Sequence, residues 1–251
     1  MRYEPARQSL EGVTNSNPKR FCMSPDREDV RRWPGASTDV EWCSQIRTPR
    51  GAMPLSALPL PGGVEFCNRD RGDFATRIDR FVSPMTRMLL SSEGLTTTLL
   101  WALLGQPVSV RCARNRRLPI ASAPLGAAGL LGVVDGDVLV RRSMLATSDR
   151  VVSVNDVVAR VDVSARAEQC VADVTAPLGE ALHAAGTGYR RTVVDAGCQD
   201  WRMPPGGQAA FKTYVLWHGN QPLMTVHEVF SPRVVPSAVA HARCAAAGKV
   251  T

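Results

Sequence analysis

Apolar side chains recur at helical spacing in the middle of the chain, where three helices are predicted. Apolar residues three and four positions apart between 78 and 89 predict one amphipathic helix. A break with N-cap chemistry at 91–94 separates it from a second helix at 96–104. A short helix opened by a proline is predicted within 176–187.

Alternation of apolar and polar residues, typical of strands, dominates the rest of the chain. Five strands are predicted, at 107–113, 137–146, 151–160, 209–218 and 221–230. The last two are joined through His218-Gly-Asn-Gln221, a tight-hairpin pattern. Helices first and then mostly hairpin-linked strands predict an α+β fold with an antiparallel sheet.

The two ends of the chain lack these patterns. Residues 1–72 hold eight of the eighteen prolines and many arginines without a sustained apolar period, which predicts a poorly ordered N-terminal extension. Residues 73–236 are predicted to form the folded domain, and residues 237–251 a frayed tail.

The positive charge does not indicate a nucleic-acid partner. The net charge is +7 and the pI is about 9.4, but lysine occurs only three times, so the charge is an arginine bias. The densest arginine cluster, at 111–117, has no aromatic residues interleaved for base stacking. We expect a small anionic substrate to be the partner that this charge attracts.

The cysteines and the apolar segments argue for a cytoplasmic protein. Seven scattered cysteines, none in a Cys-x-x-Cys spacing, favour reduced thiols over a disulfide framework, and no zinc site or other metal site is predicted. No apolar stretch is long enough to cross a bilayer, and no secretory signal is visible, so no membrane partner is expected.

One carboxylate lies where a strand favours an apolar side chain. In the predicted strand 221–230, alternation places Glu228 on the same face as Met224, Val226 and Phe230. A buried carboxylate is costly unless it is paired, hydrogen-bonded or used in function. Glu228 is therefore the first candidate functional residue.

Other candidates are a pair of arginines and two turns. Arg141 and Arg142 are adjacent in a predicted strand, so one of them should point inward. The turns at 93–96 and 175–179 each lead into a helix, where backbone N–H groups bind carboxylates well. A buried ion pair between Arg141 and Glu228 and ordinary helix capping are the structural alternatives.

Several short segments, taken in order, resemble the chorismate pyruvate-lyases, and most closely their actinobacterial branch, which makes 4-hydroxybenzoate. The segments are Ser-Glu-Gly-Leu-Thr-Thr-Thr, Leu-Val-Arg-Arg-Ser-Met-Leu, Ala-Pro-Leu-Gly-Glu-Ala-Leu and Gln-Pro-Leu-Met-Thr-Val-His-Glu-Val-Phe, within about residues 74–236. The resemblance implies one antiparallel sheet covered by helices and enclosing a ligand cavity. It also implies a cofactor-independent carbon–oxygen lyase that eliminates pyruvate from chorismate.

The resemblance also implies roles for individual residues. Arg141 and Glu228 take the catalytic positions, with Arg141 at the enolpyruvyl side. The backbone amides of Leu95 and Leu178 hold the ring carboxylate. Asp156 stands where the enterobacterial enzyme carries an arginine, and Arg142 is a candidate to replace that cation as a substrate-binding residue.

Two other functions fit the same segments. The fold family includes small-molecule-binding effector domains of bacterial transcription regulators, the UTRA type, and residues 1–70 show no helix-turn-helix pattern to accompany one. A lyase or isomerase acting on a related chorismate-derived acid in secondary metabolism is the third possibility, which the Asp156 departure motivates. Product identification after incubation with chorismate separates the three.

Overall fold

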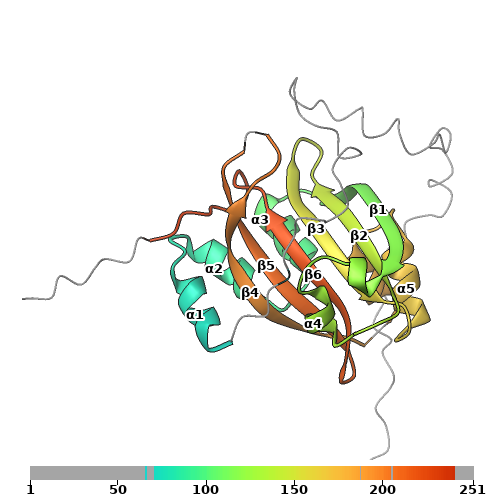
Figure 1. Cartoon of the computed structure of the whole chain (residues 1–251). Coiled ribbons are helices and arrows are strands. Elements are labelled where there is room, and N and C mark those ends of the chain that lie inside the picture. The colour runs from blue at the N-terminus through green and yellow to red at the C-terminus, as the bar shows by residue number, and fades with distance from the viewer. Residues whose placement is uncertain (1–65, 67–70, 187, 205, 241–251) are drawn as a thin grey trace, which may run out of the picture. The chain divides into compact units, whose positions relative to one another are not determined.

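Six strands form one antiparallel sheet in the computed structural model, which describes residues 66, 71–186, 188–204 and 206–240 (Figure 1). The strands are β1 (Ser109–Pro119), β2 (Asp137–Ala146), β3 (Val151–Arg160), β4 (Arg190–Asp200), β5 (Gln208–His218) and β6 (Gln221–Phe230). The predicted α+β class and antiparallel sheet are confirmed. Strand β4 was not predicted, and β1 extends six residues beyond the predicted strand at 107–113.

The strand order β1-β2-β3-β6-β5-β4 divides the sheet into two three-stranded meanders. Each meander joins strands that follow one another in the sequence, and the two meet where β3 pairs with β6. Asn155 of β3 lies opposite Glu228 of β6, and Lys212 of β5 lies opposite Glu228 on its other side. The centre of the sheet therefore carries three polar side chains in one cross-strand row.

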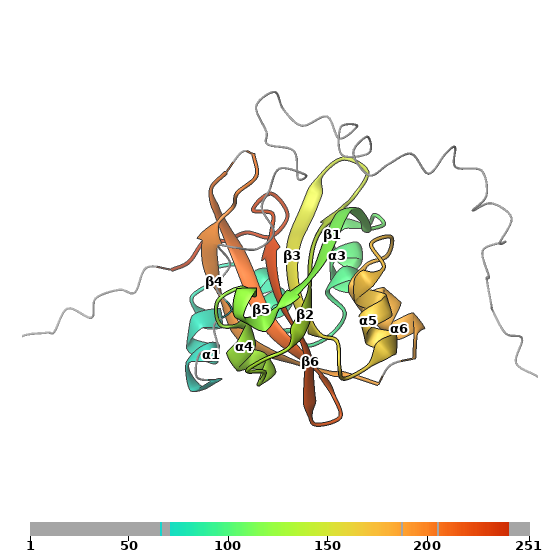
Figure 2. The same ribbon diagram turned by 45° about the vertical axis from the view of Figure 1, so that its right-hand side comes forward.

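Helices cover both faces of the sheet. Figures 1 and 2 show α4 (Ala127–Leu131) in front of the sheet and α3 (Thr96–Leu104) behind it. The remaining helices are α1 (Arg71–Asp79), α2 (Pro84–Ser91), α5 (Ala165–Ala172) and α6 (Leu178–Ala184), with a 3-10 turn at Ile120–Ser122.

The predicted helix at 78–89 is two helices, α1 and α2. Ser83 accepts a hydrogen bond from the backbone N–H of Thr86 at 3.3 Å and so caps α2, while Pro84 occupies the first helical turn. A proline there prevents α1 from continuing into α2, although the apolar spacing runs through both.

Apolar clusters fill the space on both faces. On the face that carries Glu228, helices α1, α2 and α3 pack around Phe81, Leu100 and Phe230, and helices α5 and α6 pack around Val171 and Leu182. On the other face, α4 packs with a separate cluster of buried residues: Phe66, Ile120, Ala127, Leu130, Leu131, Val138, Val140, Val158, Val194 and Val215.

The fold extends past the predicted limits of the domain at both ends. Phe66, within the predicted extension, is 2% exposed, and its N–H donates to the carbonyl of Leu125 at 2.8 Å. Val239, within the predicted tail, forms an antiparallel bridge with Phe81. The rest of the predicted extension up to residue 70 and of the tail beyond residue 240 lies outside the described residues.

Candidate functional site

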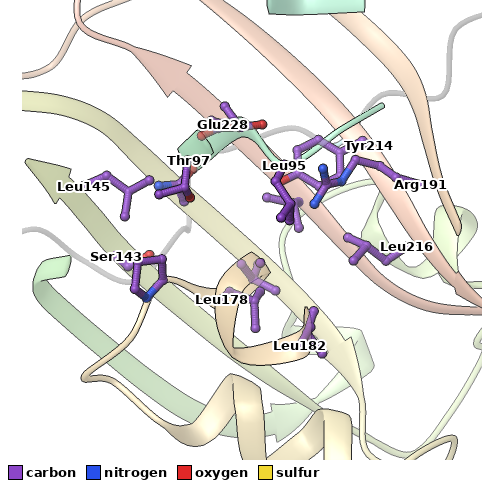
Figure 3. A pocket seen from close by; sticks show the side chains of 16 residues that line it. Leu95, Thr97, Ser143, Leu145, Leu178, Leu182, Arg191, Tyr214, Leu216 and Glu228 are labelled. Carbon is purple, nitrogen blue, oxygen red and sulfur yellow. The ribbon is translucent and has the colours of Figure 1, made fainter. Parts of the chain in front are cut away.

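A pocket lies between the sheet and the first turns of α3 and α6 (Figure 3). Its empty space is about 510 Å³, including the part that is open to solvent. Its lining is mostly apolar, with a few polar groups: Leu95, Thr96, Thr97, Ser143, Leu145, Asn155, Val157, Pro177, Leu178, Gly179, Leu182, Arg191, Tyr214, Leu216, Val226 and Glu228.

Glu228 forms the acidic side of this pocket. Its side chain is 1% exposed, as the strand alternation predicts. Oε1 accepts a hydrogen bond from the Ser153 hydroxyl at 3.4 Å, and the amide of Asn155 donates to the same hydroxyl at 3.2 Å. Oε2 has no hydrogen-bond partner among the described residues. One carboxyl oxygen is therefore left for a ligand.

Burial raises the pKa of Glu228, because the charged carboxylate loses its hydration. The positive charges of Lys212 and Arg191, and the nearby hydroxyls of Thr96 and Ser153, act in the opposite direction. Lys212 is itself fully buried, and burial lowers its pKa to about 8. The neutral form of Glu228 is therefore favoured over a wider pH range than in water.

Arg191 is the single cationic side chain among the described residues that line the pocket, and the sequence did not reveal it. Its guanidinium lies over the ring of Tyr214, with Cζ 4.7 Å from the centroid. Nη1 donates to the carbonyls of Glu93 and Gly94, and the buried Nε has no partner within the described part of the chain. The pocket thus has a cation and an acid separated by apolar side chains (Figure 3).

The two helices that open onto the pocket differ from α2 and α5 at their first turns. Helices α2 and α5 begin with serine N-caps whose hydroxyls accept a backbone N–H. The N-caps of α3 and α6 are Leu95 and Pro177, and neither makes a side-chain capping bond. Leu95 and Leu178, predicted to present backbone amides to the ligand, both line the pocket. First-turn N–H groups without caps are suited to an anionic ligand.

Arg141 is not among the residues that line the pocket, and its catalytic position stays a prediction. It is fully buried on the same sheet face as Ser143, but its guanidinium donates to the carbonyls of Cys170, Val171, Asp173 and Ala176 at 2.7–3.4 Å. No ion pair joins it to Glu228 within the described residues. The alternation gave the correct face, but the donors point into the segment between α5 and α6.

Arg142 and Asp156 lie on the opposite face of the sheet, so Arg142 does not line this pocket, and its substrate-binding role stays a prediction. They form a buried ion pair, with Nε and Nη2 of Arg142 donating to the two carboxylate oxygens at 2.6 and 2.9 Å. Asp156 is paired in register with His227 on β6. His227 shares this face, so its side chain points away from Glu228.

Arg191 was missed because strand β4 was missed. A β-bulge between Val193 and Asp195 interrupts the alternation in this segment, so the period-two pattern is short. Lys212 carried a usable signal, since alternation in the predicted strand 209–218 places it on one face with Ala210, Tyr214 and Leu216. A lysine on an apolar strand face is a candidate for a structural or functional role for the same reason as Glu228, because a buried charge is costly unless it is paired.

No helix in the described ranges has the length and apolar character that a membrane crossing requires. The same residues contain no group of three or more His, Cys, Asp or Glu side chains placed to hold a metal ion.

Solved structures with a similar arrangement include a regulator and two ligand-binding or effector domains. PhnF from Mycobacterium smegmatis is 17% identical over 61% of this chain and 70% of that chain, with a TM-score of 0.42. The effector domain of PhnF is 18% identical over 60% and 97%, with a TM-score of 0.42. The ligand-binding domain of a putative GntR-family transcriptional regulator from Bordetella bronchiseptica is 16% identical over 49% and 82%, with a TM-score of 0.36. No protein-family model and no curated protein matches the chain.

Proposed function

We propose that the domain binds a small organic acid with an apolar body in the pocket beside Glu228. The observation that carries the proposal is the free oxygen of this carboxyl group, which lies buried in a pocket wall. A buried polar atom without a partner costs about 1–3 kcal/mol, and a ligand hydroxyl or amine would remove that cost. Arg191 and the uncapped first turns of α3 and α6 supply the complementary site for an anionic group.

Titration calorimetry with 4-hydroxybenzoate tests this proposal, since that ligand combines a carboxylate, an apolar ring and a hydroxyl. We expect wild-type protein to bind it and Glu228→Gln to bind about tenfold more weakly, because a buried polar group that loses its hydrogen-bond partner costs about 1–3 kcal/mol. His227→Gln is the matched control, because it alters the adjacent residue on the other sheet face. Equal affinity for wild type and Glu228→Gln would refute the role of Glu228.

A second candidate function is the elimination of pyruvate from chorismate. In that reaction the ether C–O bond breaks, the ring loses a proton as it becomes aromatic, and the departing enolpyruvyl group takes up a proton to become pyruvate. The raised pKa of Glu228 favours this candidate, because a carboxyl group that keeps its proton to a higher pH than in water can donate that proton at an ether oxygen. Arg191, which lines the pocket, would then stabilise the developing anion in place of Arg141.

Incubation with chorismate separates the enzyme from the binding domain. The lyase proposal expects equimolar pyruvate and 4-hydroxybenzoate, identified by mass spectrometry, and a loss of about 10²–10³ in rate for Glu228→Gln. Binding of 4-hydroxybenzoate without pyruvate release would establish the binding function alone. A different aromatic product would identify a related chorismate-derived acid as the substrate or product class.

A further inference from the structure

Two segments, residues 92–97 and 173–179, lead into the pocket lining and form its two walls. The helix that precedes each wall ends on a buried cation of the sheet. Helix α5 leads through residues 173–177 to Leu178, and the carbonyls at its end are bound by Arg141. Helix α2 leads through residues 92–94 to Leu95, and the carbonyls at its end are bound by Lys212. The same arrangement occurs twice, on strands from the two different meanders.

The contacts of Arg141 fix the whole connection between α5 and α6. Nη1 reaches the carbonyls of Cys170 and Val171 in the last turn of α5 and that of Asp173 in the connection, at 2.7–3.4 Å. Nη2 reaches the carbonyl of Ala176 at 2.9 Å, two residues before Leu178. A guanidinium offers donors in a rigid planar fork, so these bonds define the path of the backbone as well as its charge.

Lys212 holds the connection between α2 and α3 in the same manner. Its Nζ donates to the carbonyl of Leu89 in the last turn of α2 at 3.1 Å and to that of Ser92 at 3.2 Å. Helix C-terminal carbonyls lack intrahelical partners and carry partial negative charge, which favours a cation there. Neither Lys212 nor Arg141 lines the pocket, so any effect on a ligand passes through the segment that each one holds.

We infer that Arg141 and Lys212 are positioning residues that fix the two walls of the pocket, one wall each. The walls meet at Gly179 and Leu95, where a methyl group added to the glycine would come within 3.1 Å of the leucine side chain. A wall that shifts would therefore change the shape of the pocket and the placement of its first-turn N–H groups. The consequence for ligand affinity rests on the proposed function, whereas the fixing of the walls does not.

Amide hydrogen exchange followed by mass spectrometry tests the inference segment by segment. In Arg141→Met we expect exchange of residues 173–179 to rise at least about tenfold while residues 92–97 stay as in wild type. In Lys212→Met the reverse is expected. Arg150→Met is the control, because Arg150 is an exposed arginine in the turn between β2 and β3 that pairs with Asp149 and should alter neither segment. If Arg141→Met does not fold, Arg141→Lys keeps the charge without the fork and should still loosen residues 173–179.

The pattern of exchange decides the outcome. Unchanged exchange in both segments, or a uniform rise throughout the sheet, would overturn the inference, because a purely global loss of stability is not confined to one wall. Affinity for 4-hydroxybenzoate should fall about tenfold in each Met variant, and an unchanged affinity alongside local loosening would overturn the link to the ligand. Should wild type fail to bind this probe, the proposed function fails while the exchange result still stands.

Discussion

Glu228 and His227 are neighbours in β6 whose side chains lie on opposite faces of the sheet. Glu228 faces the pocket, while His227 is packed between Phe66 and Phe211, with ring centroids 5.9 and 4.9 Å away. The ring nitrogens of His227 are hydrogen-bonded to Thr213 and Gln199, both at 2.9 Å. Glu228 thus has a carboxyl oxygen without a hydrogen-bond partner among the residues that the structure describes, whereas both ring nitrogens of the adjacent His227 are hydrogen-bonded.

The burial of His227 predicts a loss of stability in mild acid. Burial, followed by the charge of Arg142, lowers the pKa of His227 from 6.5 to about 4. Between these values the unfolded chain binds a proton that the native state does not, so the free energy of unfolding falls as the pH falls through this range. At 1.36 kcal/mol per pH unit, the contribution is about 3 kcal/mol.

Urea denaturation of wild type and His227→Gln at several pH values measures this contribution. The difference between the two stabilities should change by about 3 kcal/mol from pH 7 to pH 4, with wild type losing more. Parallel pH profiles for the two proteins would mean that His227 is not buried in its neutral form.

Residue-level patterns predicted some of the site and missed the rest for physical reasons. Alternation placed Glu228 and Arg141 on the correct sheet face, since the period of a strand is independent of its neighbours. It could not show that the donors of Arg141 turn toward the end of a helix about thirty residues later in the chain. The direction of a long side chain depends on partners that only the tertiary structure brings near.

At the scale of elements, one glycine decides whether Phe66 can pack beside α4. Gly126 is the N-cap of α4 and has a φ of +83°, and a Cβ built there would overlap the carbonyl oxygen of Phe66. Gly136 has a similar φ of +89° with open space around it. Both glycines therefore have a left-handed backbone conformation, but only Gly126 lies in close contact with the backbone of Phe66.

We expect Gly126→Ala to be more destabilising than Gly136→Ala. The left-handed conformation alone costs about 1–2 kcal/mol for alanine at either position. Gly126→Ala should cost at least about 1 kcal/mol more, because Phe66 must leave its place in the core or the backbone must shift. Chemical denaturation of both variants gives the comparison, and equal losses would show that the approach of Phe66 does not matter.

Element boundaries were predictable where the signal was local. The hairpin between β5 and β6 followed from His218-Gly-Asn-Gln221, and the structure has these strands paired in that register. The apolar spacing at 78–89 hid the Ser83-Pro84 break, because two helices in the same core cluster present the same periodicity. The bulge in β4 hid a whole strand.

At the scale of the molecule, the C-terminal segment joins parts of the fold that are distant in the sequence. The Ser237 hydroxyl donates to the carbonyl of Gln208 at 2.7 Å. The N–H of Val82 donates to the carbonyl of Ala238 at 2.9 Å, and that of Ala240 donates to the carbonyl of Arg80 at 2.7 Å. These bonds link the sheet to the region between α1 and α2.

A protein that ends at residue 236 should therefore be less stable than one that ends at residue 240. The three hydrogen bonds, at about 0.5–1.5 kcal/mol each, predict a loss of roughly 1.5–4.5 kcal/mol. Urea denaturation of the two shortened proteins measures it. Equal stability would support the sequence-based expectation that the domain ends at 236.

The overall class of the fold was predictable, while the composition of the pocket was not. Helical and strand periods are properties of single segments, and they sufficed for an α+β protein with an antiparallel sheet. The pocket takes its cation from β4, its acid from β6 and its walls from α3 and α6. Which of these elements lie side by side depends on the strand order, and in this sheet β6 rather than β4 lies next to β3.

The central claim is that the pocket beside Glu228 is the ligand site, and an NMR titration of the labelled protein with 4-hydroxybenzoate tests it most directly. We expect the largest amide shifts to fall on Leu95, Leu178 and Glu228, with little change at Asp156 on the other face. Largest shifts outside the pocket, for example around the separate hollow at Gly197 and Cys198, would contradict it. So would the absence of any shift at millimolar ligand.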